Sequence, residues 1–233
     1  MLRSRSFTTR SALAAVALAT SVLLGACGGS SSPGATGAAS GIELKTGPEI
    51  AAAAQTAALA ATSVHVKGKA GTIEIETRIG ANGAIGTVDL PRGKVDLVRV
   101  GDKYWIKSDA AFWAKSGIPA TSAAKLNGKY VDVSDQSAQF EGFSSVKKFF
   151  GTAYQGSRAT KGEVTTMNGV RVITLKDIDG SLTFVATEGE PFPMRVSDTG
   201  ANGGQIDFTE WNVPVTITAP TADQIIDLTT LRK

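Results

Sequence analysis

From residue 62 onward, most of the chain alternates between hydrophobic and polar positions. Residues 72–79 show this best, because Ile73, Ile75 and Ile79 take odd positions while charged residues take most even ones. A period of two is typical of a strand with one face on the core and the other in water. The pattern predicts a largely antiparallel sheet of consecutive hairpins, joined by turn pairs such as the Asn-Gly at 82–83. Further predicted strands, rich in β-branched or aromatic residues, are 95–100, 103–107, 170–175, 182–187, 194–198, 205–211 and 215–218.

The first departure from this alternation is residues 46–61, where a helix is expected. Thr46 and Glu49 form a capping-box pattern, Pro48 suits the first turn, and an alanine-rich run follows. These features favour a helix that begins near residue 46. Its small side chains would let it lie very close to a sheet.

The second departure lies in residues 134–158. Phe143, Val146 and Phe150 recur there at positions i, i+3 and i+7, which predicts a short amphipathic helix. This helix is a candidate lid over the sheet. Because residues 42–233 contain no internal repeat and no linker, we expect them to form one α+β domain.

The first 26 residues have a different composition. Three arginines in residues 1–10 precede an uncharged apolar run at 11–24, which is short and rich in alanine. This arrangement is typical of a secretory signal peptide rather than of a transmembrane helix. Residues 28–41 contain only Gly, Ser, Ala, Thr and one Pro, which is typical of a flexible tether.

The residues that join these two segments, Leu24-Gly25-Ala26-Cys27, resemble a bacterial lipobox. The resemblance implies that the signal is removed before Cys27 and that the Cys27 thiol carries a diacylglyceryl group, with chains such as palmitate. The mature protein would then be anchored to the outer side of the cell membrane. An ordinary signal peptide followed by an incidental free cysteine is the alternative. The expected organisation is signal peptide at 1–26, lipidated Cys27 and tether at 27–41, and a lipid-binding-like domain at 42–233.

The net charge of +3 belongs to the N-terminal segment. The chain has 24 basic and 21 acidic residues, and residues 1–26 hold three arginines and no acid, which leaves 21 of each sign from residue 27 onward. Nucleic-acid-binding proteins normally carry a basic patch or stripe. We therefore expect no nucleic-acid partner, and the sequence identifies no protein partner.

Catalytic and metal-binding patterns are absent from the sequence. A single cysteine excludes an intramolecular disulfide and a multi-thiolate zinc site, and no nucleophile elbow, P-loop or dinucleotide-binding motif occurs. The one histidine, His65, lies between two valines and is expected to be a solvated residue on the polar face of a strand. We therefore expect no enzymatic activity, no cofactor and no metal.

Aromatic residues gather in the middle of the chain and leave two interpretations open. They form either an ordinary core with its rim or the lining of an apolar cavity between a bent sheet and its helices. Alternation does not distinguish the two, because a cavity wall and a core share the same period. The residues concerned are Tyr104, Trp105, Phe112, Trp113, Phe140, Phe143, Phe149, Phe150 and Trp211.

The order of these segments resembles the actinobacterial lipoproteins of the LppX/LprG type. The likeness lies in the lipobox, the tether, the alanine-rich helix and the segments 98–107, 112–113, 130–133, 167–170, 193–196, 206–211 and 217–220. It implies a strongly curved antiparallel sheet, a LolA-like half-barrel, with helices on the concave face. It also implies no catalytic residues.

The same resemblance implies a hydrophobic cavity that binds, and in some members transfers, acylated lipids or glycolipids. The modest content of large apolar residues in this chain indicates a small, shallow or filled cavity. A non-catalytic cell-surface or accessory module with a filled core is therefore the alternative function. The predicted cavity wall consists of Ile73, Ile75, Val98, Trp105, Phe143, Val146 and Phe150.

Overall fold

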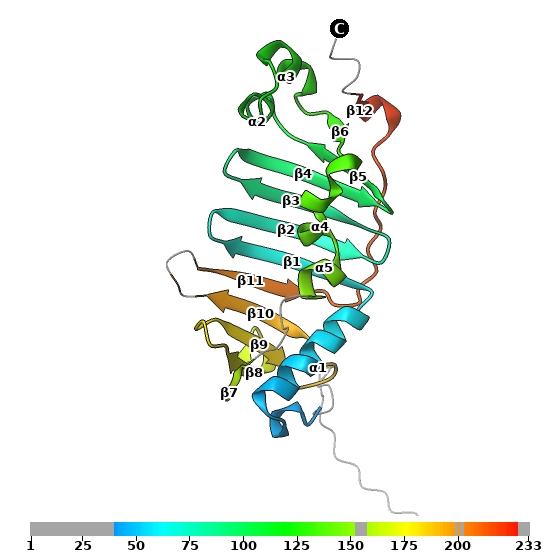
Figure 1. The fold of residues 1–233 in the computed structure, drawn as a ribbon. Helices are drawn as coiled ribbons and strands as arrows, with labels where there is room; N and C mark the ends of the chain where they lie inside the picture. The colour runs from blue at the N-terminus through cyan, green and yellow to red at the C-terminus, as the bar shows by residue number, and fades with distance from the viewer. Residues whose placement is uncertain (1–39, 152–157, 199, 201–202, 228–233) are drawn as a thin grey trace, which may run out of the picture. The chain divides into compact units, whose positions relative to one another are not determined.

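The computed structural model describes residues 40–151, 158–198, 200 and 203–227, which all belong to one compact unit, Thr36–Lys233. In this unit twelve strands form a single sheet with the order β12-β6-β5-β4-β3-β2-β1-β11-β10-β9-β8-β7 (Figure 1). Neighbouring strands pair antiparallel, except that β12 pairs parallel with β6. The predicted α+β class and curved antiparallel sheet are confirmed.

The first five strands form consecutive hairpins joined by two-residue turns. Gly101 supplies a positive φ of 59° in one of these turns, a conformation that glycine adopts without steric cost. Gly86, by contrast, is required by a close approach, since a Cβ there would lie 2.1 Å from the backbone oxygen of Glu76. The strands are β1 (Ser63–Ala70), β2 (Ile73–Gly80), β3 (Gly83–Leu90), β4 (Gly93–Val100) and β5 (Lys103–Lys107).

The remaining strands extend the sheet at both ends. The late strand β11 pairs with β1, so the two halves of the chain share one continuous sheet. At the other end, β12 pairs with β6 beside β5. The bounds are β6 (Tyr130–Asp132), β7 (Thr160–Met167), β8 (Val170–Lys176), β9 (Leu182–Ala186), β10 (Pro193–Asp198), β11 (Gly204–Thr209) and β12 (Ile225–Ile226).

The prediction of a strand at 215–218 is wrong. This segment has no strand partner and crosses the turn between β2 and β3, where the Ile217 side chain lies against Gly80 and Gly83. Its alternation of Val215 and Ile217 therefore reflects packing on strand ends and not pairing in the sheet. Further along, Lys129 Nζ donates to the backbone oxygen of Asp223 at 3.1 Å, which holds this C-terminal segment near β6.

The first predicted helix is confirmed as α1 (Gly47–Ala60). The Glu49 carboxylate accepts hydrogen bonds from the backbone N–H and the hydroxyl of Thr46, at 2.8 and 2.7 Å, which satisfies donors at the start of the helix. The hydrogen bonds with Thr46 also lower the pKa of Glu49. A Cβ at Gly47 would lie 2.0 Å from the backbone oxygen of Ala159, so α1 approaches its neighbour very closely.

The second predicted helix is divided in two by Ser145, which has an extended backbone with φ −139° and ψ 121°. The two parts are α4 (Glu141–Ser144) and α5 (Val146–Gly151). Short helices not expected from the pattern lie between β5 and β6. The other helical segments are α2 (Ala110–Lys115), α3 (Ala120–Leu126), η1 (Ile42–Leu44), η2 (Ser134–Gln139) and η3 (Ala222–Gln224).

One face of the sheet, called the inner face here, carries the helices α1, α4 and α5 (Figure 1). The opposite face is called the outer face. The larger core lies between the inner face and α2–α5, while a smaller core lies between α1 and β8–β9. Within the described ranges, no helix is long and apolar enough to cross a membrane.

Candidate functional site

Strand pairing arranges the inner face in rows of facing side chains. One row runs from Val64 through Ile79, Ala84 and Arg99 to Tyr104, across β1 to β5. Val64, Ile79 and Ala84 are completely buried and Tyr104 is 5 % exposed. Arg99 is therefore a cation within an otherwise apolar row, and its Nε is buried without a hydrogen-bond partner.

An aromatic cluster fills the inner face next to α5. Phe150 is 1 % exposed, and its ring centroid lies 5.0 Å from those of Phe149 and Phe208 and 5.5 Å from that of Trp211. Trp211 also stacks on Phe192, with centroids 4.6 Å apart and planes inclined by 5°. These contacts are typical of stable aromatic packing, so the inner face is filled by protein side chains at this point.

The helices α4 and α5 are attached to the rest of the unit mainly by apolar contacts. Phe140, Phe143, Val146 and Phe149 are half-buried against the larger core. Gln55 Nε2 of α1 donates a hydrogen bond to the backbone oxygen of Phe150 at 3.1 Å. At the start of α4, the Phe140 backbone oxygen accepts hydrogen bonds from the Phe143 N–H and the Ser144 hydroxyl. Helices this short have little stability of their own, so packing keeps them in place.

A pocket of about 360 Å³ opens on the same side, between the end of α1, the turn after β2 and the junction of α4 and α5. Such a volume is at the lower end of the roughly 300–1,000 Å³ of small-molecule sites. Its walls combine cations, hydroxyl groups and aliphatic side chains. The residues that supply these groups are Arg99, Lys147, Thr62, Ser145, Leu59 and Val146.

Five of the seven predicted cavity residues gather at the inner face. Ile75 and Phe150 are buried in the larger core, and Ile73, Phe143 and Val146 pack against it. Of these, Val146 also lines the pocket. Whether they contact a lipid stays a prediction.

The other two predicted cavity residues, Val98 and Trp105, face away from these five. They pair with each other across β4 and β5, and their neighbours Leu97 and Ile106 belong to the larger core. Because successive side chains in a strand point to opposite faces, Val98 and Trp105 lie on the outer face. The structure therefore does not bring them together with the inner-face residues.

The sequence pattern did not single out Arg99, Leu59, Thr62 or Ser145, which line the pocket. Arg99 had a signal in the sequence, since it lies two positions after Leu97 and so shares its face of the strand. Leu59 and Thr62 come from the end of α1 and Ser145 from the junction of α4 and α5, and only the folded chain brings these segments together.

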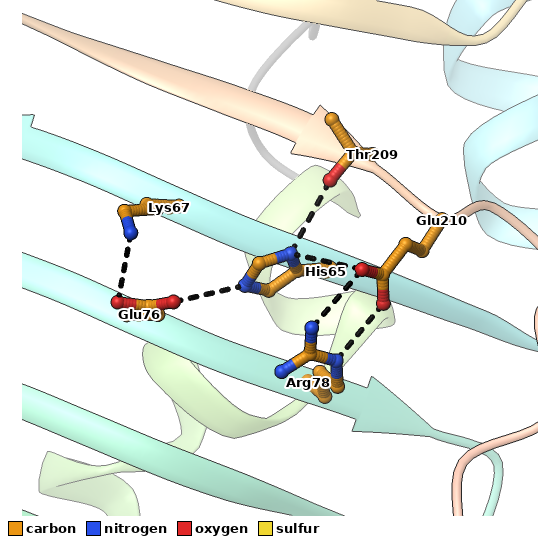
Figure 2. Close-up of polar contacts among 6 residues, drawn as sticks. All are labelled: His65, Lys67, Glu76, Arg78, Thr209 and Glu210. Carbon is orange, nitrogen blue, oxygen red and sulfur yellow. Dashed lines mark hydrogen bonds and ion pairs between the residues drawn. The ribbon is translucent and has the colours of Figure 1, made fainter.

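The outer face between β11, β1 and β2 carries a polar network around His65 (Figure 2). His65 Nε2 lies 3.5 Å from Glu76 Oε1, and His65 Nδ1 lies 3.6 Å from Glu210 Oε1 and 3.3 Å from Thr209 Oγ1. With 9 % exposure, His65 is buried. The expectation of a solvated histidine is wrong, because side chains from β2, β11 and residue 210 surround the ring.

Each carboxylate of this network also has a cationic partner. Arg78 donates two hydrogen bonds to Glu210, at 2.9 and 3.0 Å, and these lower the pKa of the Glu210 carboxyl group. Lys67 Nζ lies 3.1 Å from Glu76 and is the main cause of the lowered pKa of that group. The charges on this face are thus compensated locally, which is typical of a structural surface network.

The predicted lipidation site receives no structural description. Cys27, the predicted lipidation site, lies outside the described residues. Among the residues that are described, no group of three or more His, Cys, Asp or Glu side chains is placed to hold a metal ion.

Comparison with known proteins gives a likeness in structure alone. No protein-family model matches the chain, and no curated protein matches it significantly. LprF from Mycobacterium bovis superposes with a TM-score of 0.53 at 12 % identity, over 76 % of this chain and 97 % of LprF. Lipoprotein LppX from Mycobacterium tuberculosis gives a TM-score of 0.48 at 16 % identity, over 73 % of this chain and 99 % of LppX. The chain therefore has the half-barrel fold of the LppX/LprG-type lipoproteins, which confirms the resemblance seen in the sequence at the level of the fold.

Proposed function

We propose that this protein is a lipoprotein, anchored by Cys27 at the extracytoplasmic face of the cell membrane, that binds acylated lipid or glycolipid at the inner face. Binding is non-covalent, with no bond made or broken, and a bound lipid is passed on to an acceptor. The fold supports this proposal, together with the lipobox and the tether at 28–41.

The observation that carries the proposal is the weak attachment of α4 and α5. Their half-buried aromatic and aliphatic side chains cover the inner face, and Gln55 of α1 donates a hydrogen bond to the backbone oxygen of Phe150. An acyl chain offers the same apolar contact as these side chains and gains about 25 cal/mol for each Å² of apolar surface removed from water. Because the existing pocket is small, entry of an acyl chain requires α4 and α5 to move outward, as a lid does.

The test uses the full-length chain with Cys27→Ala, so that no covalently attached acyl group contributes. We expect organic extraction of the purified protein to release an acylated lipid in about equimolar amount. An extract without lipid, combined with no binding of a fluorescent fatty-acyl probe, would reject the proposal.

The second candidate function is a non-catalytic binding or accessory module on the cell surface. The observation that favours it is the aromatic cluster around Phe150 and Phe208, which fills the inner face with side chains. This function predicts that crosslinking on intact cells recovers a protein partner while the purified protein carries no lipid. Recovery of stoichiometric lipid would instead favour the first candidate.

A further inference from the structure

The pocket at the end of α1 differs in charge from other hollows of the described chain. Its walls include Arg99 and Lys147 and no acidic residue. Two hollows on the outer face instead mix lysines with aspartate or glutamate, and one of them includes the ion pair of Lys67 and Glu76. Of these three hollows, only the pocket at the end of α1 has cations and no carboxylate in its walls.

Arg99 is the main source of that charge. It lies on the apolar inner face, and no carboxylate of the described residues lies within ion-pair distance of it. Its guanidinium carbon lies 6.0 Å from the centroid of the Tyr104 ring. The Nε–H is buried and has no acceptor. Buried polar groups normally have partners, so this arginine lacks an acceptor that a ligand can supply.

Lys147 and Ser145 add further hydrogen-bond donors to the pocket. Lys147 has no carboxylate partner in the described part of the chain and adds a second cation. Ser145 Oγ accepts a hydrogen bond from the backbone N–H of Lys148 at 3.4 Å, which leaves its proton free to donate to a ligand. The Thr62 hydroxyl already donates its proton to Asn212 Oδ1 at 3.2 Å, so Thr62 lines the pocket without offering a donor to a ligand. The donors that remain available to a ligand are a guanidinium, an ammonium and a hydroxyl group. Such a set suits an anion, since guanidinium groups match phosphate oxygens well.

We infer that this pocket binds the phosphate of an acylated lipid, with Arg99 as the main contact and Lys147 as the second; the inference rests on the proposed function. The phosphate is held at the pocket, and the acyl chains lie on the inner face beneath α4 and α5. The proposed ligand class is thereby narrowed from acylated lipids in general to anionic phospholipids and phosphate-bearing glycolipids.

Apolar side chains favour a lipid over free phosphate as the source of this group. Leu59, which is 37 % exposed, and Val146 form part of the same pocket wall. Val146 also packs against the larger core of the inner face. A site for a small inorganic ion gains nothing from such neighbours, whereas a phospholipid places apolar atoms next to its phosphate.

The experiment titrates the full-length Cys27→Ala protein with two fluorescent lipids that have identical acyl chains, phosphatidylglycerol and diacylglycerol. We expect phosphatidylglycerol to bind roughly tenfold more tightly. Arg99→Met should reduce this preference to about the two- to threefold that Lys147 supplies, and continued binding of diacylglycerol, which has no phosphate, shows that the variant is folded. Lys147→Met should weaken phosphatidylglycerol binding by about two- to threefold, because the lysine is exposed. The matched control is Arg78→Met, which removes an arginine from the outer face and should change neither affinity.

The outcomes distinguish failure of the headgroup site from failure of the proposed lipid binding. Equal affinities in the parent protein, or an unchanged preference in Arg99→Met, would overturn the headgroup site while leaving acyl-lipid binding intact. Failure to bind either lipid would overturn the proposed function and this inference with it. Arg99-dependent binding of inorganic phosphate, without tighter binding of phosphatidylglycerol than of diacylglycerol, would also overturn the lipid assignment.

Discussion

The two faces of the sheet each carry an arginine, and the two arginines differ in whether they have a carboxylate partner. On the outer face, Arg78 is paired with Glu210 through two hydrogen bonds beside the buried His65. On the inner face, Arg99 lies in a row of buried apolar side chains and its Nε has no acceptor. Charges that are compensated locally maintain a structure, whereas an uncompensated charge on an apolar surface lowers stability and marks a place for a ligand.

The contacts that the side chains make also differ between the two faces. Inner-face side chains meet two helices that are held by packing, and outer-face side chains on β1 and β2 meet ion pairs that cross from strand to strand. Separation of α4 and α5 from the inner face would therefore mainly part apolar side chains, whereas rearrangement of the outer face of β1 and β2 would break ion pairs.

The largest expected effect concerns the packed inner face. Replacing Phe150, which is 1 % exposed, with alanine leaves a cavity in the aromatic cluster and should lower the free energy of unfolding by about 3–5 kcal/mol. Urea denaturation measures this change. The control is Leu44→Ala, at a side chain that is 87 % exposed, where a change within about 0.5 kcal/mol is expected. Similar losses in both variants would show that the aromatic cluster is not a packed core.

A smaller effect should distinguish the two arginines. Arg99→Met removes an unpaired cation from an apolar surface and should raise the free energy of unfolding by about 0.5–1 kcal/mol. Arg78→Met removes an exposed ion pair and should lower the thermal midpoint by roughly 1–3 °C. Thermal unfolding of both variants at low salt tests the difference in sign. Destabilisation by Arg99→Met would mean that Arg99 has a structural partner.

The smallest expected effect is the pH dependence of the outer face. The pKa of Glu210 is lowered from its ordinary value of 4.5, chiefly by the Arg78 hydrogen bonds. The stabilisation by this carboxylate is therefore fully present above pH 4.5 and is lost as the pH falls through the lower pKa of the folded protein. Glu210→Gln should consequently be less stable than the parent at pH 7, and the difference should shrink below pH 4.5.

Urea midpoints at pH 7, 5, 4 and 3 would follow that difference. The control is Glu163→Gln, because Glu163 lies on the exposed edge strand β7 and has no ion-pair partner among the described residues. A difference between Glu210→Gln and the parent that stays constant down to pH 3 would contradict the assigned role of the carboxylate.

Sequence alternation predicted most strands. It also predicted that Ile73 and Ile75 face inward, because each of these isoleucines is followed by a charged residue. It did not predict β3, where Gly83 and Gly86 weaken the strand pattern. The reason for Gly86 is a contact between strands, the approach of the Glu76 backbone. Local propensity contains no information about such a contact.

The assignment of faces failed where two apolar residues are adjacent. Leu97 is followed by Val98, and Trp105 is followed by Ile106. Alternation alone therefore does not tell which residue of each pair lies on the inner face. Only the pairing of Val98 with Trp105, together with the burial of their neighbours, places these two residues on the outer face. The pocket around Arg99 could not be predicted from the sequence either, because its walls come from segments that lie far apart in the chain.

The central claim is that acyl lipid binds at the inner face and not elsewhere on the protein. Its most direct measurement is the affinity of a fluorescent fatty-acyl probe for two matched variants of the full-length Cys27→Ala chain, Val146→Glu and Ile85→Glu. Val146 belongs to α5 and is half-buried against the core of the inner face, whereas Ile85 is 38 % exposed on the outer face. A carboxylate placed against an acyl chain is costly, so Val146→Glu should weaken binding more than tenfold while Ile85→Glu leaves it unchanged. Equal affinities in the two variants would contradict the claim.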